Sequence, residues 1–274
     1  MSEPSSLPST VGLIAGEGAF PFMVLDEAAR RGIEVVTLAI EGEADPGLAD
    51  KAAGPFHTIG ISQLSKCVRI FHEAGISRAI MAGRVRHVSA FQILRPDRLT
   101  LKVLSRLSSR STDEMLRTLA DVLGEEGVEL VDSTLLLRSH LSSEGPMTKR
   151  GPRKREREDF EFGVEMARGL AELDIGQTVV VKAKTVVAVE AMEGTDGAIR
   201  RAGELVDGPL TVVKVARPRQ DMRFDVPVIG PTTIDSMAAS GATALGLEIG
   251  RVLLLEREAL LRNADERSIT VVGI

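Results

Sequence analysis

Charged residues suited to binding a phosphate and a hard cation alternate in the segment Lys214–Gly230, KVARPRQDMRFDVPVIG. If residues 221–226 are extended, the two-residue period of a strand places Asp221, Arg223 and Asp225 on one face and apolar residues on the other. Carboxylates supply oxygen ligands for a hard cation, and an arginine supplies a planar fork of donors for a phosphate. The segment therefore predicts a cation and phosphate site, or alternatively a surface ion-pair ladder that contributes little.

A second group of acids lies in a predicted turn between a strand and a helix. Glu190, Glu193 and Asp196 are close together in the sequence, and the helix is expected to start near Gly197 with Thr195 or Asp196 as its cap. An acid at the start of a helix is favoured by the helix dipole, which accounts for one of the three. The other two make a functional cluster the better interpretation.

The first half of the chain opens with a strand, a glycine turn and a helix. Val11–Ala15 is predicted as a buried strand, Gly16 and Gly18 as a tight turn, and Phe20–Arg31 as a helix. The backbone N–H groups that begin such a helix, with Ala19 among them, can bind an anion. The alternative is that the glycines only let strand and helix pack closely.

Alternating strands and helices continue from this unit and predict an α/β fold. Strands are expected at 34–40, 57–61, 79–83 and 128–131, so the first half should be a Rossmann-like parallel sheet with helices on both faces. Arg84 and Arg86 follow the strand at 79–83, where such sheets bind ligands, although a solvated loop is the alternative.

The domain limits follow from a change in composition. Residues 1–140 are predicted to form the N-terminal domain, 141–157 a linker, and 158–274 a mixed α/β catalytic domain. The linker carries a dense basic run, for which a solvated segment is the better interpretation and contact with an anionic membrane surface or polyphosphate the alternative. Two acid clusters in one domain and glycine turns in the other suggest a ligand in a cleft between them.

Composition excludes several classes of protein. A net charge of −5 and the absence of Tyr and Trp argue against a general nucleic-acid binder. Cys67 is the single cysteine, so an internal disulfide and a cysteine-ligated metal site are excluded. The start lacks an apolar signal segment, and no later apolar run approaches membrane-spanning length. We therefore expect a cytoplasmic protein whose contact with the inner membrane, if any, is peripheral.

Four motifs together resemble the LpxI family over nearly the whole chain. They are GLIAGEGAFP at 12–21, MAGRV at 81–85, VEAMEGTD at 189–196 and KVARPRQDMRFDVPVIG at 214–230. The resemblance implies a Mg²⁺-dependent hydrolase of lipid A biosynthesis. It would cleave the pyrophosphate of UDP-2,3-diacylglucosamine to UMP and 2,3-diacylglucosamine 1-phosphate (lipid X), with the substrate held between the two domains.

The resemblance places the catalytic aspartate, and the chemistry of the residues predicts the other roles. A catalytic aspartate falls in QDMRFD, with Asp225 the first choice and Asp221 the second, and Lys214 and Arg223 counter the phosphate charge. Substrate contacts are expected from Gly16, Gly18, Ala19, Arg84, Thr195 and Gln220. The Mg²⁺ ligands are expected among Asp225, Asp221, Glu190, Glu193 and Asp196.

The sequence departs from the family pattern at two places. Relatives tend to have Gly-Asp-Asp before a helix where this chain has Ser111-Thr112-Asp113, which weakens a role for an acid at position 112. They tend to have lysine where this chain has Arg84, which keeps a cationic contact there. The rival hypotheses are a non-catalytic nucleotide-sugar-binding regulator and a nicotinamide-dependent oxidoreductase, but the glycine spacing argues against the oxidoreductase. A homodimer is expected only from the general frequency of symmetric oligomers.

Overall fold

The protein consists of two compact units. The computed structural model describes residues 7–85, 96–108 and 111–274. One unit contains the chain up to Leu137 together with the tripeptide Met222–Phe224, and the other contains Arg138–Asp221 and Asp225–Ile274. The tripeptide therefore belongs with the first unit although it comes from the second half of the sequence.

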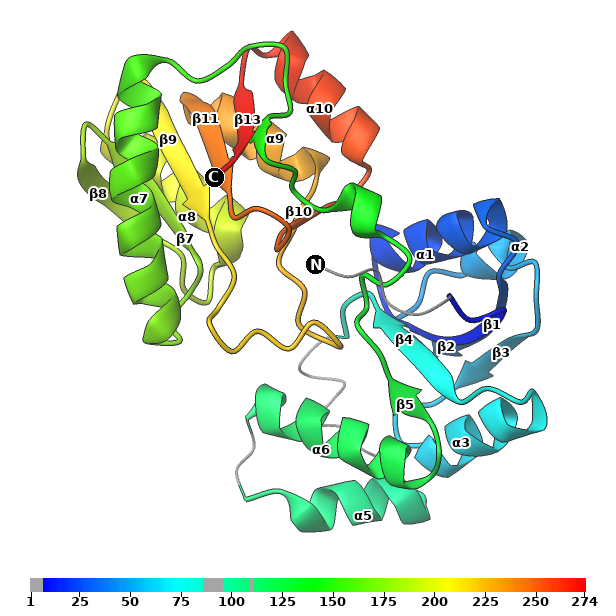
Figure 1. Ribbon diagram of the computed structural model, residues 1–274. Helices are drawn as coiled ribbons and strands as arrows, with labels where there is room; N and C mark the ends of the chain where they lie inside the picture. Colours follow the sequence, from blue (N-terminus) through cyan, green and yellow to red (C-terminus); the bar gives the residue numbers. More distant parts are fainter. Residues whose placement is uncertain (1–6, 86–95, 109–110) are drawn as a thin grey trace. The chain divides into compact units, whose positions relative to one another are not determined.

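The first unit is built on a parallel five-stranded sheet with the order β3-β2-β1-β4-β5. The chain runs outward from β1 through β2 to β3 and then returns to the other side of β1. The order consequently reverses between β1 and β4, which is the position where open α/β sheets bind ligands. This arrangement confirms the predicted Rossmann-like sheet (Figure 1). The strands are β1 (Thr10–Ala15), β2 (Glu34–Ile40), β3 (Phe56–Ile59), β4 (Arg78–Ala82) and β5 (Glu129–Leu130).

The helices of the first unit cover this sheet. They are α1 (Ala19–Arg30), α2 (Leu48–Lys51), α3 (Leu64–Glu73), α5 (Arg98–Arg106) and α6 (Thr112–Glu125). The core is formed largely by apolar residues of the strands with α3, α5 and α6. Phe71 of α3 is fully buried, and a Cβ added at Gly12 of β1 would lie 2.7 Å from its ring. Gly12 thus permits direct contact between helix and strand.

The second unit is a mixed six-stranded sheet with the order β6-β13-β11-β9-β7-β8. Strands β13, β11 and β9 are parallel, whereas β6, β7 and β8 pair in the antiparallel sense. The mixed α/β prediction is thereby confirmed. The strands are β6 (Gly145–Pro146), β7 (Thr178–Lys182), β8 (Thr185–Val189), β9 (Leu210–Lys214), β11 (Ala242–Leu247) and β13 (Thr270–Gly273). A separate parallel pair is formed by β10 (Val228–Ile229) and β12 (Leu253–Leu254).

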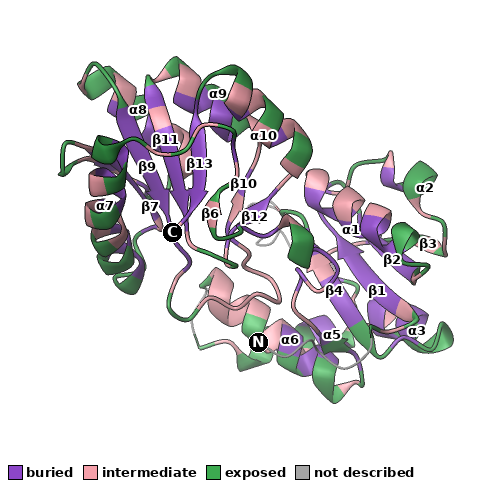
Figure 2. Cartoon of the chain, turned by 45° about the horizontal axis from the view of Figure 1, so that its top comes forward, coloured by how far each residue is buried: buried purple, intermediate pink, exposed green. Residues whose placement is uncertain are grey.

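Alternation along the buried strands divides the second unit into three layers. Val179, Val181 and Val213 pack on one face with α7 (Lys154–Glu172). Val180 and Val212 pack on the other face with apolar residues of α8 (Gly194–Leu205), α9 (Pro231–Ala239) and α10 (Arg257–Glu266). Figure 2 shows the central strands as buried and the outer faces of these helices as exposed. Successive side chains of a strand therefore reach different layers, and this alternation also sets the direction of the Lys214 side chain.

Residues 141–157, predicted as a linker, contain ordered elements of the second unit. After a 3₁₀ turn at Arg138–His140, β6 adds to the sheet edge beside β13, and α7 begins at Lys154. Arg150 Nη1 donates to Glu156 Oε2 at 2.7 Å and Arg150 Nη2 donates to Glu156 Oε1 at 3.0 Å. Arg150 is thus part of the fold, while its basic neighbours from Arg153 to Arg157 remain exposed.

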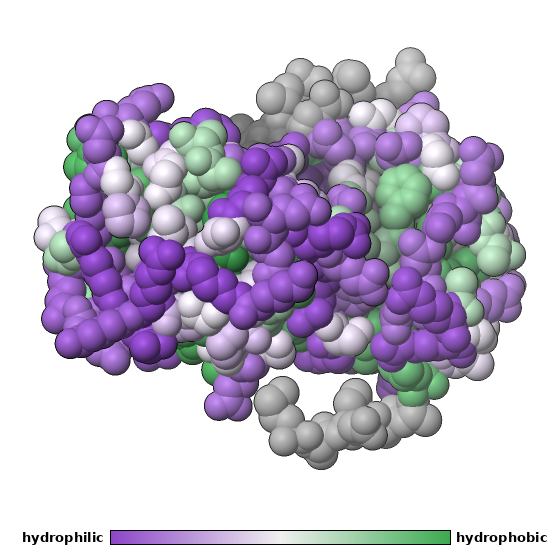
Figure 3. Space-filling view, turned by 90° about the horizontal axis from the view of Figure 1, so that it is seen from above, coloured by the Kyte–Doolittle hydropathy of each residue, from purple (hydrophilic) through white to green (hydrophobic). Residues whose placement is uncertain are grey.

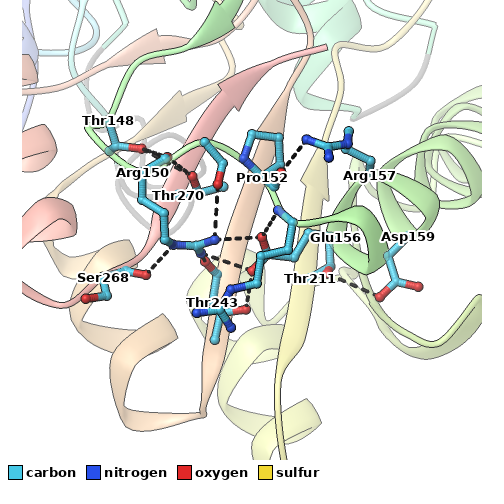
Figure 4. Close-up of polar contacts among 12 residues, drawn as sticks. Thr148, Arg150, Pro152, Glu156, Arg157, Asp159, Thr211, Thr243, Ser268 and Thr270 are labelled. Carbon is cyan, nitrogen blue, oxygen red and sulfur yellow. Dashed lines mark hydrogen bonds and ion pairs between the residues drawn. The ribbon is translucent and has the colours of Figure 1, made fainter.

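The Arg150–Glu156 pair is surrounded by further hydrogen bonds (Figure 4). Arg150 also donates to the carbonyls of Thr243, at 2.5 Å, and Ser268, at 2.9 Å. Glu156 accepts from the Thr243 hydroxyl at 2.8 Å and from the N–H of Arg153 at 2.7 Å. The network joins the start of α7 to the segments beside β11 and β13.

On the face seen in Figure 3, hydrophilic side chains predominate among the described residues, and hydrophobic ones form small patches. Among the helices that the structure describes, none combines the length and the apolar character needed to cross a bilayer.

Candidate active site

Lys214 is the centre of a buried polar cluster in the second unit. It ends β9, and the alternation of that strand directs its side chain away from the layer that contains Val213. Its antiparallel neighbour on β7 is Thr178, whose hydroxyl accepts from Lys214 Nζ at 3.3 Å. The hydroxyl of Thr195, in the first turn of α8, accepts from the same nitrogen at 2.8 Å. Lys214 is only 3% exposed.

Glu190 supplies the negative charge of this cluster. Its Oε2 lies 3.7 Å from Lys214 Nζ, and its Oε1 accepts from the Thr195 hydroxyl at 2.8 Å. Burial raises the pKa of the carboxyl, but the charge of Lys214 and the hydrogen bonds from Thr178, Thr195 and the N–H of Gln177 outweigh it. The pKa of Glu190 is therefore below its usual range, and the group is ionised at neutral pH.

The charge of Lys214 is opposed by its burial. Burial lowers the pKa of Lys214, whereas the carboxylates of Glu190, Asp196 and Asp225 raise it, and the net pKa lies below the usual lysine value. These three acids were predicted as site residues together with Lys214. The structure brings them within electrostatic range of a single ammonium group.

Asp225 lies in a turn rather than in an extended strand. The predicted alternation over residues 221–226 is wrong, because the N–H of Asp225 donates to the carbonyl of Asp221 at 2.9 Å and the residues between them form the turn. Arg217 Nη1 lies 3.5 Å from the Asp225 carboxylate, and its Nε lies 3.2 Å from Asp174. Hydrogen-bonding side chains before Pro227 favour this turn over continued strand.

Gln220 and Arg223 serve the turn in different ways. The Gln220 amide donates to the carbonyl of Asp225 at 2.6 Å and accepts from the N–H of Arg217 at 2.8 Å, so its side chain braces the backbone. Arg223 belongs with the first unit, where its guanidinium lies 5.5 Å from the centre of the Phe224 ring. The predicted face shared by Arg223 with both aspartates is not formed.

The start of α8 also differs from expectation. The helix begins at Gly194 instead of near Gly197, and Glu193 occupies the cap position without a side-chain capping bond. Thr195 and Asp196 consequently lie inside the first turn, which frees the Thr195 hydroxyl to bind Lys214 and Glu190. Glu193 instead lies 2.5 Å from Arg201.

The glycine turns of the first unit meet at the point where its strand order reverses. Glu17 and Arg84 form an isolated antiparallel bridge, with N–H to carbonyl distances of 2.8 and 3.0 Å. A Cβ added at Gly16 would lie 2.6 Å from the carbonyl oxygen of Arg84, and one at Gly83 would lie 2.7 Å from that of Glu17. Only glycine permits this contact. The Arg84 side chain is exposed and lies 3.2 Å from the Glu17 carboxylate.

The N-terminus of α1 follows directly from the first of these turns. Gly18 is its cap residue with a φ of 99°, and Ala19 begins the helix without a side-chain capping bond or an acid in the first turn. Such a terminus presents backbone donors suited to an anion. Arg86 lies outside the described residues.

The five predicted metal ligands are not assembled into one shell. Across residues 7–85, 96–108 and 111–274, no three His, Cys, Asp or Glu side chains are grouped so as to hold a metal ion. Glu190 and Glu193 are each engaged by a cation of the chain, Lys214 and Arg201 respectively. Mg²⁺ usually takes one or two protein carboxylates and completes its shell with water and phosphate. Asp225, with its side chain 37% exposed, suits that kind of binding better than the two glutamates.

Sequence reasoning did not single out two residues that contact the site. Thr178 contacts Lys214 because the two residues are paired between β7 and β9. No local motif in the sequence reveals the register of that pairing. Arg217 stands within the quoted motif, but its contacts with Asp225 and Asp174 depend on the turn. Cys67 is excluded as a nucleophile, because burial, with a smaller contribution from Asp97, raises its pKa to about 12.

Comparison with known proteins gives a consistent result over both halves of the chain. Residues 10–140 match the LpxI N-terminal domain, and residues 143–272 match the LpxI C-terminal domain. The chain is 31% identical over 275 aligned positions to the UDP-2,3-diacylglucosamine pyrophosphatase LpxI of Caulobacter vibrioides, covering 96% of this chain and 97% of that protein.

Solved structures give much weaker matches. The biotin carboxylase domain of a thermophilic 2-oxoglutarate carboxylase bound to ADP is 13% identical with a TM-score of 0.28, and the match covers 72% of this chain and 33% of that one. The corresponding domain from Hydrogenobacter thermophilus is 14% identical with a TM-score of 0.25, covering 64% and 35%. The chain thus spans about a third of these proteins.

Proposed function

The chain belongs to the LpxI family, and we infer from this membership that it is a hydrolase that cleaves the pyrophosphate of UDP-2,3-diacylglucosamine in lipid A biosynthesis. The products are UMP and 2,3-diacylglucosamine 1-phosphate. The observation that carries this conclusion is the match of both family domains, which together account for residues 10–140 and 143–272.

We propose that the second unit carries the chemistry. Hydrolysis of a phosphoanhydride requires a positioned water and positive charge close to the phosphate oxygens. Asp225 is the first candidate for orienting the water and Asp221 the second. Lys214, held by Thr178 and Thr195, would supply positive charge to the phosphate oxygens. Its position is buried, and there such a charge acts more strongly than in water. Arg223 is also proposed as a counter-charge, and its guanidinium lies over the Phe224 ring in this structure.

Substrate contacts are proposed in both units. In the first unit, the N–H groups that follow Gly16 and Gly18, including that of Ala19, and the exposed guanidinium of Arg84 suit phosphate oxygens. In the second unit, the first turn of α8 at Thr195 suits a phosphate in the same way. Gln220 is proposed to act by bracing the turn that carries Asp225.

We propose Mg²⁺ as the cofactor, with Asp225 as its principal protein ligand and Asp221 as the second. Bound there, the ion would neutralise charge on the phosphate oxygens. Asp196 is a further candidate, and the engaged carboxylates of Glu190 and Glu193 would reach the ion only through water. A Mg²⁺ titration followed by calorimetry, with wild type and Asp225→Ala, tests the assignment without depending on turnover.

We further propose that the enzyme is cytoplasmic and works as a homodimer. It would associate peripherally with the inner membrane, because its lipid-linked substrate lies there. The exposed basic residues Arg153, Lys154 and Arg155 at the start of α7 suit an anionic surface. Flotation with vesicles containing anionic lipid at low salt tests this contact, and a protein that stays at the bottom of the gradient contradicts it.

The test of the function is phosphorus NMR of purified protein with UDP-2,3-diacylglucosamine and Mg²⁺, beside Asp225→Ala. We expect the wild type to release UMP and the variant to bind substrate without turnover. A protein that binds the nucleotide sugar but never releases UMP, with any divalent metal, would instead be the non-catalytic regulator considered above.

A further inference from the structure

Three residues between the two candidate catalytic aspartates are held by the first unit. Met222–Phe224 belongs to that unit, whereas Asp221 and Asp225 on either side belong to the second unit. The three residues are the tip of the turn that the N–H of Asp225 closes on the carbonyl of Asp221. The tip of this short turn therefore belongs to one unit and its two ends to the other.

Ser133 is the polar anchor of this tip. Its N–H donates to the carbonyl of Met222 at 2.8 Å, and its hydroxyl oxygen lies 2.6 Å from the carbonyl oxygens of both Arg223 and Met81. Met81 belongs to β4, so the tip is tied to a central strand of the sheet. Ser133 is 0% exposed, and its hydroxyl has one proton to donate. Removing it leaves two carbonyls without that donor.

Phe224 is the apolar anchor. Its ring packs against the core cluster formed by the sheet, α3, α5 and α6, and the guanidinium of Arg223 lies over it at 5.5 Å. Packing against the core restricts the movement of the ring, and the cation over it adds a favourable contact. The bonds from the Phe224 backbone lead directly to Asp225.

We propose that Ser133 and Phe224 are positioning residues that fix the Asp221–Asp225 turn for catalysis. The proposal rests on the proposed function, in which Asp225 and Asp221 act on the substrate. Gln220 and Arg217 hold the same turn through the Asp225 carbonyl and carboxylate. Loss of the anchor at the tip removes one of the constraints that place the carboxylate, and small misplacements of a reacting group are costly to rate.

The kinetic test compares Phe224→Ala and Ser133→Ala with matched controls from the same unit. Phe56→Ala removes another partly buried phenylalanine, on β3, and Ser65→Ala removes another hydroxyl bonded to backbone, that of Leu99. We expect kcat to fall about tenfold to a hundredfold in Phe224→Ala and less in Ser133→Ala, with KM changed less than kcat. Phe224→Leu should recover most of the rate. Thermal unfolding of all variants should show that the loss of kcat in the anchor variants exceeds what their loss of stability explains.

Trypsin offers a readout that does not depend on activity. The bond after Arg223 lies inside the anchored tip, while the bond after exposed Arg219 lies in the same loop outside it. We expect Ser133→Ala and Phe224→Ala to raise cleavage after Arg223 relative to cleavage after Arg219. Ser65→Ala and Phe56→Ala should leave that ratio at the wild-type value.

The outcomes separate this role from the function on which it rests. A wild type that releases no UMP overturns the proposed function. A wild type that turns over, with Phe224→Ala matching it in kcat, overturns the positioning role, and so does an unchanged trypsin ratio in both anchor variants. Equal losses of kcat in the control variants also overturn it, because they would reduce the effect to general destabilisation.

Discussion

Lys214 Nζ lies 3.7 Å from Glu190 Oε2, and both groups are almost completely withdrawn from water. An ion pair in such a place gains from the low dielectric but has lost the hydration of both charges, so its net effect on stability is small while the removal of one partner is costly. The pair is therefore better understood through what it presents to a ligand than through the stability it provides. Thr195 links the two charges with one hydroxyl, which accepts from the lysine and donates to the glutamate.

The first prediction concerns the charge of Lys214. Lys214→Met should lower kcat/KM by roughly 10²–10³, as for the loss of a preorganised electrostatic contact. It should also lower the free energy of unfolding by about 3–5 kcal/mol, since Glu190 is left buried without its cation. The double variant Lys214→Met/Glu190→Gln should regain stability but not activity. Lys182→Met is the control, because Lys182 lies at the end of β7 away from Thr178. Full activity of Lys214→Met would contradict the proposed catalytic role of Lys214.

The same residue predicts an alkaline limb in the pH profile. Because its folded pKa is below the usual lysine value, Lys214 loses its proton, and kcat/KM falls, at a lower pH than for an exposed lysine. Between the folded and the unfolded pKa the unfolded chain binds more protons, so this group makes stability rise with pH while activity falls. Lys214→Arg should move the limb to higher pH, because a guanidinium stays protonated. An unmoved limb would assign it to another group.

The sequence revealed the sheets well because their signals are local. Buried strands such as 11–15 and 210–213 are largely apolar runs, and the alternation of strands with helices predicts the parallel sheet of the first unit. It also predicted Lys214, Glu190, Asp196 and Asp225 as site residues, and in the structure the charges of the three acids act on the lysine.

The remaining features depend on contacts between residues far apart in the chain. The segment 221–226 reads as an alternating strand, but Gln220 and Ser133 supply hydrogen bonds that stabilise a turn there. Helix α5 carries both exposed and buried leucines in a short stretch and was not predicted, although Asp97 caps it through the N–H of Thr100. The pattern of residues 221–226 cannot reveal that Ser133, 90 positions before Arg223, donates a hydrogen bond to the Arg223 carbonyl.

The second prediction concerns the glycine contact in the first unit. Gly83→Ala should destabilise the protein more than Gly75→Ala, since both have a positive φ but only Gly83 faces backbone atoms, at 2.7 Å. The control should cost about 1–2 kcal/mol, the usual strain of a left-handed residue. If the turns bind phosphate oxygens, Gly83→Ala should also weaken UMP binding in calorimetry while Gly75→Ala does not. Equal UMP affinities would remove these turns from the binding site.

The third prediction concerns Glu156 at the start of α7. Glu156→Gln should lower the free energy of unfolding by about 1.5–3 kcal/mol, because charge-assisted bonds to Arg150, Thr243 and the N–H of Arg153 are weakened or lost. Glu158→Gln, whose partner Lys154 is exposed at 3.9 Å, is the control and should stay near wild type.

The pH dependence of stability distinguishes this network from simple packing. Burial raises the pKa of Glu156, but Arg150 and the hydrogen bonds from Arg153 and Thr243 outweigh it, and the folded pKa lies below the usual glutamate value. The contribution of Glu156 is therefore complete above the unfolded pKa and is lost as pH falls through the folded pKa. Urea unfolding at several acidic pH values should show the wild type and Glu156→Gln converging as the pH is lowered. A constant difference between them would mean that the side chain stabilises the protein by its shape alone.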